Sequence, residues 1–113
     1  MESLHKFLTE QSALCRERAA SLTADDRRDE AVFEKIRGNV YEIFSAVLTT
    51  ARKQPAPMDF FRRQLAAIPA NWEAALEKAR AHGDEAKAHT ELLKLEAVRA
   101  LRDSMEESLS EIL

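Results

Sequence analysis

Hydrophobic residues recur every three or four positions along four long stretches of this chain of 113 residues. That interval places them on one face of an α-helix, so each stretch offers an apolar face to a common core. Residues that interrupt helices are scarce, with only two glycines and three prolines. The sequence therefore predicts an all-α fold that forms a single helical domain over residues 1–113.

The breaks between these stretches set the expected ends of the helices. We expect helices over about residues 3–21 and 24–53, from Pro57 to just before Gly83, and from residue 85 to near the end of the chain. Thr23 and Asp84 are expected to cap the helices that follow them, and Pro57 suits a first helical turn. Gly83 suits a left-handed helix end. Short connections between such long helices predict an up-and-down four-helix bundle.

Pro69 falls inside the third stretch, where a proline removes one helical hydrogen bond and clashes with the carbonyl four residues earlier. The apolar face nevertheless keeps its phase from Leu65 through Ile68 to Trp72. We therefore expect the third helix to be kinked near Pro69, with the alternative that it splits there and restarts at Asn71.

Gly38 raises the same question in the second stretch. The apolar face passes from Ile36 through Val40 to Phe44 without a change of phase, which a loop would normally cause. We expect one continuous helix with Gly38 on its outer face.

Opposite charges are spaced to form ion pairs across one helical turn. The pairs expected on outer, solvated faces are Glu34–Arg37, Glu77–Arg80, Glu91–Lys94 and Glu96–Arg99. A further set should meet at one pole of the bundle, where acids late in the chain approach bases from other helices. The acids are Asp103, Glu106, Glu107 and Glu111, and the bases are Lys6, Arg52, Lys53, Arg62 and Arg63.

The charge balance argues against partners that are held by a basic surface. Seventeen basic and twenty acidic residues are intermixed and give a net charge of -3, whereas nucleic acids and anionic membranes attract a basic face. No apolar run approaches the ~18 residues of a membrane span, and the N-terminus does not resemble a secretory signal. The single cysteine, Cys15, is expected to be a buried thiol in a cytoplasmic protein.

Motifs for metal, cofactor or covalent chemistry are missing from the sequence. A di-metal bundle repeats Glu-x-x-His on two helices, but only Glu2 and His5 have this spacing, and alanines precede His82 and His89. The two glycines are too far apart to form a phosphate-binding loop. We expect no metal site, no cofactor and no catalytic residue, so the sequence favours a protein that is not an enzyme.

Two polar residues stand in the apolar face of the first helix. Gln11 and Arg18 lie seven positions apart, in phase with the leucines around them. An arginine in this place must extend to solvent, pair with a carboxylate or bind an anion. Three readings follow for this arginine. It extends to solvent or forms an ordinary ion pair, it lines a ligand pocket with Gln11 and Tyr41 or His89, or it contacts another chain.

The second helix carries more apolar surface than one neighbour can cover. Tyr41, Phe44 and Leu48 widen its apolar face, and Gly38 would allow a close approach from outside. Either the helix serves two neighbours in the same chain, or these residues form an interface with a second chain. We expect a non-catalytic interaction or scaffold module that forms a homodimer or binds another protein. The alternative is a bundle that binds a small molecule or metal and is possibly an enzyme.

Overall fold

The computed structural model describes residues 1–112, with side chains as far as residue 107. Its helices are α1 (Glu2–Ala24), α2 (Arg28–Ala51), α3 (Pro57–Ala81) and α4 (Glu85–Ile112). They form the up-and-down four-helix bundle that the sequence predicts, and the described range contains no strand.

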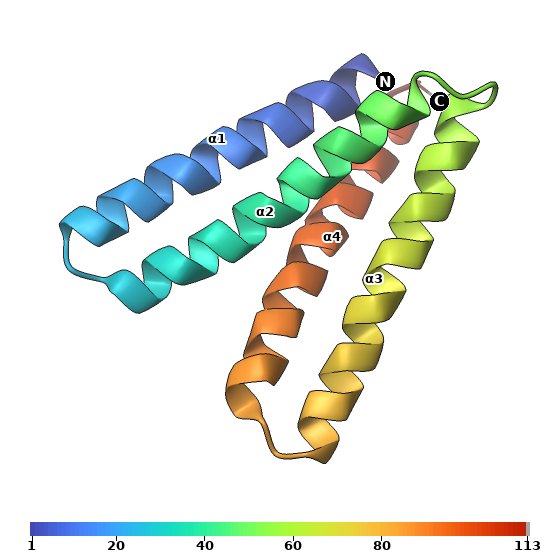
Figure 1. The fold of residues 1–113 in the computed structure, drawn as a ribbon. Helices are drawn as coiled ribbons and strands as arrows, with labels where there is room; N and C mark the ends of the chain where they lie inside the picture. Colours follow the sequence, from blue (N-terminus) through green and yellow to red (C-terminus); the bar gives the residue numbers. More distant parts are fainter. Residues whose placement is uncertain (113) are drawn as a thin grey trace.

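The bundle consists of two antiparallel hairpins, α1–α2 and α3–α4 (Figure 1). The hairpins converge at the end that holds both termini and the α2–α3 connection, and they diverge toward the two tight turns. Helices α2 and α4 each contact all three other helices, whereas α1 does not approach α3 anywhere in residues 1–112. Helices α2 and α4 are therefore the central pair.

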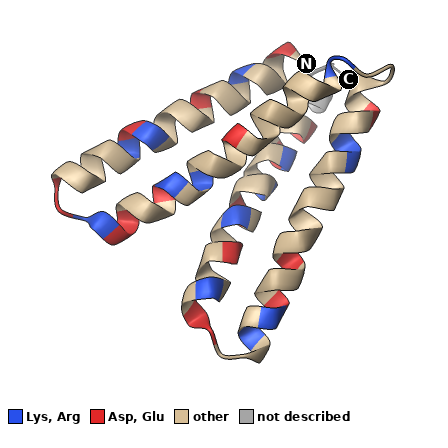
Figure 2. Cartoon of the chain, in the orientation of Figure 1, with Lys and Arg blue, Asp and Glu red and all other residues tan. Residues whose placement is uncertain are grey.

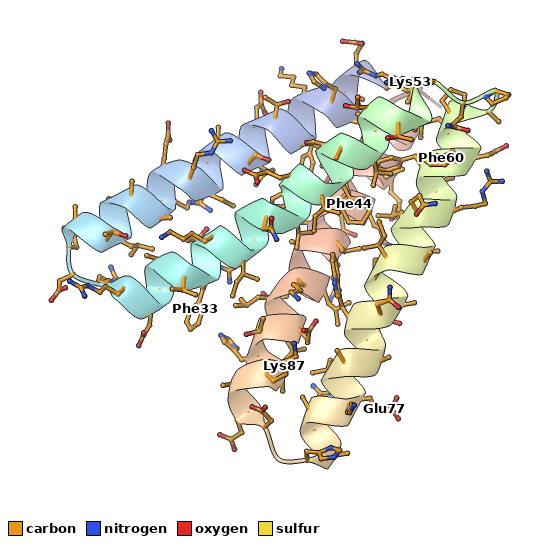
Figure 3. All side chains as sticks on the ribbon, viewed as in Figure 1. Phe33, Phe44, Lys53, Phe60, Glu77 and Lys87 are labelled. Atoms are coloured by element: carbon orange, nitrogen blue, oxygen red, sulfur yellow. The ribbon has the colours of Figure 1, made fainter. Side chains whose placement is uncertain are left out.

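The core lies where the hairpins converge. Phe44 of α2 is fully buried. Its ring packs in T-shaped contacts with the rings of Phe61 and Trp72, whose centres lie 6.1 Å and 6.5 Å from its own. Figure 3 shows Phe44 between α2 and the α3–α4 hairpin. Leu8 and Leu101 bring α1 and α4 into the same cluster. Such aromatic side chains each bury a large apolar area, so this cluster joins the two hairpins.

The turn between α3 and α4 agrees with the sequence. Gly83 has a φ of 69°, in the left-handed region that favours glycine. The Asp84 carboxylate accepts a hydrogen bond from the backbone N–H of Lys87 at 3.1 Å, as an N-terminal cap does. Pro57 occupies the first turn of α3, also as expected.

The expected cap of α2 is wrong. Thr23 lies within α1, and its hydroxyl donates to the carbonyl of Ala19 at 2.8 Å. Helix α1 continues to Ala24, the chain turns at Asp26 with a φ of 60°, and α2 begins only at Arg28. Threonine hydroxyls can bond backward to a carbonyl four residues earlier, and here this bond replaces the capping role.

Helix α3 is continuous through Pro69, so the alternative of a split helix is wrong. Because Pro69 has no N–H, the carbonyl of Leu65 loses its helical partner. The guanidinium of Arg102 in α4 donates to that carbonyl at 3.0 Å. Pro69 itself is fully buried. The cost of the proline is thus offset by a hydrogen bond from the neighbouring helix.

Gly38 is not on the outer face of α2, so this expectation is wrong. It is buried against α1, and a Cβ built on Gly38 would lie 3.1 Å from the Cβ of Cys15. The residue marks a close approach of the first two helices. Because α2 has neighbours on several sides, the side of the helix that carries Gly38 also faces another helix, α1.

Two of the four expected helical ion pairs form. Glu34 meets Arg37 at 2.8 Å and Glu91 meets Lys94 at 3.3 Å. Arg37 also reaches Glu96 of α4 at 3.7 Å, which links the two central helices. The other two expected pairs, Glu77–Arg80 and Glu96–Arg99, do not form among the described side chains.

The expected ion pairs at the pole do not form among the side chains of residues 1–107 either. Arg52 meets Glu2 at 3.6 Å rather than an acid of α4. Asp103, Glu106 and Glu107 make no ion pair with any described side chain, and the side chain of Glu111 lies outside the described residues. Both ends of the chain and the α2–α3 connection meet at this pole. An acid at the start of α1, Glu2, therefore reaches Arg52 in place of the expected acids of α4.

The bond from Arg102 to the carbonyl of Leu65 can be tested by a double-mutant cycle with Pro69. Arg102→Met keeps most of the side-chain stem and removes the donor, so we expect it to lower the free energy of unfolding by about 1–2 kcal/mol. In a Pro69→Ala background the restored backbone N–H can donate to the same carbonyl, and the cost should fall by half or more. Urea unfolding of the four variants measures this coupling. Equal costs in both backgrounds would contradict it.

Candidate functional site

The seam between α1 and α2 is built from small side chains. Cys15 and Ala19 of α1 and Gly38 of α2 are all buried in it. Small residues let two helix backbones approach closely and leave little bulk to fill the rim of the contact. A groove of about 810 Å³ follows this seam. It is lined by Ser12, Cys15, Arg16, Ala19, Ala20, Thr23, Val32, Glu34, Lys35, Ile36, Gly38, Asn39 and Glu42.

Two polar atoms in the wall of the groove have no hydrogen-bond partner in the chain. They are the hydroxyl oxygen of Ser12, a residue that is 7% exposed, and the Oε2 atom of Glu34. A buried polar atom left without a partner costs about 1–3 kcal/mol. Both residues line the groove, and their two unpartnered atoms lie beneath its surface.

Charged and polar groups gather around Glu34. Its Oε1 atom accepts a hydrogen bond from Arg37 at 2.8 Å. Burial, and then the negative charge of Glu34, raise the pKa of the Cys15 thiol, while Arg18 and Arg37 oppose the rise. Burial also raises the pKa of Tyr41, as does the nearby Cys15. Cys15 is therefore a protonated, buried thiol at neutral pH and is poorly suited to act as a nucleophile.

The four predicted ligand-binding residues are only partly brought together. Arg18 is exposed and lies close enough to the buried Tyr41 for its charge to lower the pKa of that residue. Gln11 is half-buried, two turns before Arg18 in α1. His89 is exposed on α4, where its ring makes a T-shaped contact with the ring of Phe33, with 4.7 Å between the ring centres. Arg18 and Tyr41 thus belong to one cluster, and His89 lies at a different contact between helices.

The residues predicted to face a second chain are inside this one. Phe44 and Leu48 are at most 1% exposed, Tyr41 is buried with its ring against Phe7, and Gly38 lies in the α1–α2 seam. Helix α2 contacts α1, α3 and α4, so neighbours in the same chain cover its wide apolar surface. Any surface that α2 offers to a second copy is made by other residues.

Val32 is an exposed apolar side chain that the apolar pattern of the sequence does not single out. It is 50% exposed on α2 and lines the groove. The sequence feature that could have revealed it is its position, outside the apolar face that runs through Phe33 and Ile36.

Glu91 is the most deeply buried charged residue of the described part, although its pair with Lys94 was expected on a solvated face. It is 1% exposed, and its Oε1 atom lies 3.1 Å from the ammonium of Lys87 and 3.3 Å from that of Lys94. The Lys94 ammonium also lies 5.6 Å from the centre of the Trp72 ring. Two lysines thus compensate for Oε1 of the buried carboxylate, whereas its Oε2 atom has no partner among the described residues. The face of the Trp72 ring attracts the Lys94 ammonium and helps to hold it there.

Within residues 1–112, no helix combines the length and apolar character that a bilayer span requires. The described side chains contain no group of three or more histidine, cysteine, aspartate or glutamate residues placed to hold a metal ion. No protein-family model matches the sequence, and comparisons with curated proteins and with solved structures give no significant match.

The raised pKa values of Cys15 and Tyr41 predict a loss of stability in alkali. A group whose pKa is raised by folding stabilises the fold below its unfolded pKa, and this contribution is lost as the pH rises through the folded value. We therefore expect the free energy of unfolding to start falling above about pH 8.5, where an unfolded thiol ionises. Urea unfolding between pH 7 and 10.5 should show a smaller fall for Cys15→Ala, and a smaller fall near pH 10 for Tyr41→Phe. Variant profiles parallel to that of the wild type would contradict this assignment.

Proposed function

We propose that this chain is a non-catalytic interaction module that associates with a second copy of itself through the outer face of the α1–α2 hairpin. The observation that carries the proposal is the groove along the seam, with the half-exposed Val32 in it. Apolar side chains exposed at a groove with a polar rim are typical of protein interfaces.

The face is large enough for a stable dimer. Helix α2 has 24 residues and is therefore about 36 Å long, and two adjacent helices are about 20 Å wide. This gives a footprint of about 700 Å², close to the roughly 800 Å² that each partner buries in an interface of standard size. The whole chain has a surface of 7417 Å².

The charges on this face suit a partner with the same sequence. The groove is lined by two basic residues, Arg16 and Lys35, and two acidic residues, Glu34 and Glu42. Figure 2 shows charges of both signs along α1 and α2. A two-fold interface sets one surface against itself, so it needs both signs on that surface.

A cytoplasmic location is part of the proposal. The thiol of Cys15 is free and buried, which suits a reducing compartment.

A second candidate function is the binding of a small molecule in the same groove, favoured by the unpartnered atoms of Ser12 and Glu34. These acceptors would suit a ligand that carries hydrogen-bond donors. A ligand screen by thermal shift tests this function: stabilisation that is lost in Ser12→Ala would support it, and a screen without stabilising ligands would count against it.

Self-association is tested by sedimentation velocity over a wide range of concentration. We expect the average molecular mass of the wild type to rise from that of a monomer toward that of a dimer as the concentration increases. Val32→Glu should weaken association tenfold or more, since it removes a half-exposed valine whose further burial in the contact is worth about 1 kcal/mol, and it also adds a charge to the contact.

Ala74→Glu is the matched control, because it makes the same charge change at an exposed position of α3, which does not line the groove. It should leave association unchanged. A wild-type chain that stays monomeric at every concentration would overturn the proposal. If the two variants weakened association equally, the groove would not be the interface.

A further inference from the structure

Three residues that line the groove lie along one face of α2. Lys35, Asn39 and Glu42 are spaced by four and then three positions, so their side chains point the same way. All three are exposed. The face thus carries a base at one end, an acid at the other and an amide between them.

We propose that the two copies pack antiparallel along α2, about a two-fold axis that passes between Gly38 and Asn39. This proposal rests on the proposed function, because it names the arrangement of the same homodimer. Such an axis brings each α2 residue of one copy opposite the α2 residue of the other copy that lies equally far beyond the axis along the helix. Lys35 of each copy then faces Glu42 of the other, and the contact contains this ion pair twice.

Both charged residues are free to make this contact. Lys35 forms no ion pair with any described side chain of its own chain. Glu42 meets only Arg16, at 3.7 Å, and the two side chains are 56% and 72% exposed. Exposed pairs of this kind contribute little, so Glu42 can exchange Arg16 for a lysine of the second copy at small cost.

The charges also select the antiparallel direction over the parallel one. Parallel packing of the same faces would place Lys35 near Lys35 and Glu42 near Glu42, and like charges at an interface are unfavourable. Antiparallel packing pairs each base with an acid. Asn39 then lies next to the axis, where its amide has both donors and an acceptor for the same amide of the other copy.

The test exchanges the charges one at a time and then mixes the products. Lys35→Glu gives a copy with two acids on this face, and Glu42→Lys gives a copy with two bases. Each variant alone should dimerise about tenfold more weakly than the wild type, because both pairs become repulsive. An equimolar mixture of the two should recover association, since every acid then faces a base.

The double variant, Lys35→Glu with Glu42→Lys, should dimerise as the wild type does. Sedimentation velocity measures the dissociation constants, and circular dichroism shows that each variant keeps its helices. The losses in the single variants should shrink at 1 M salt, where charges are screened within about 3 Å.

The outcomes separate this proposal from the one on which it rests. Recovery in the mixture supports the antiparallel arrangement, because a merely structural role of either residue would not be rescued by a different molecule. A wild-type dimer with single variants that associate equally well would overturn the arrangement and leave self-association standing. A strictly monomeric wild type would overturn both.

Discussion

The close contact of α1 with α2 at Cys15 and Gly38 is the constraint on which the rest of the bundle depends. Because Gly38 has no side chain, α1 lies directly against one side of α2. The large side chains of α2, above all Phe44, are then directed at α3 and α4. A bulky residue at position 38 would separate the first two helices and change the position of the aromatic cluster relative to both hairpins. The same closeness leaves the groove along the outer rim of the seam.

The two helices of the second hairpin are joined at Pro69. A proline in the middle of α3 leaves one carbonyl without its helical donor, and Arg102 of α4 supplies a replacement. The residue that weakens α3 internally thus ties it to its neighbour, next to the core position of Leu65. In this way a local cost in one helix becomes a contact between two helices.

Much of this fold follows from the sequence, because periodicity and turn chemistry act over short distances. The four helices, the turn at Gly83 and the cap at Asp84 depend on residues within a few positions of one another. The errors concern which neighbour a helix face meets. Gly38 and Glu91 were placed on outer faces, because the spacing of a residue does not reveal how many helices surround its own. Both proved to be buried.

The candidate site was harder to predict for the same reason. The proximity of Arg18 to Tyr41 is part of the predicted site, but Ser12, Glu34 and Val32 line the groove only through the register of α1 against α2. That register depends on how closely the small residues let the two backbones approach, and no short sequence motif encodes it.

The absence of contact between α1 and α3 within residues 1–112 has a consequence for how the molecule assembles. Its strongest contacts join helices that follow one another in the chain, within each hairpin. Bringing two such helices together closes only a short loop, so little conformational entropy is lost before their contacts form. Helical proteins with mainly local contacts fold in microseconds to milliseconds. Each hairpin can therefore form early, and the docking of Phe44 against Phe61 and Trp72 would be the late event that makes the transition cooperative.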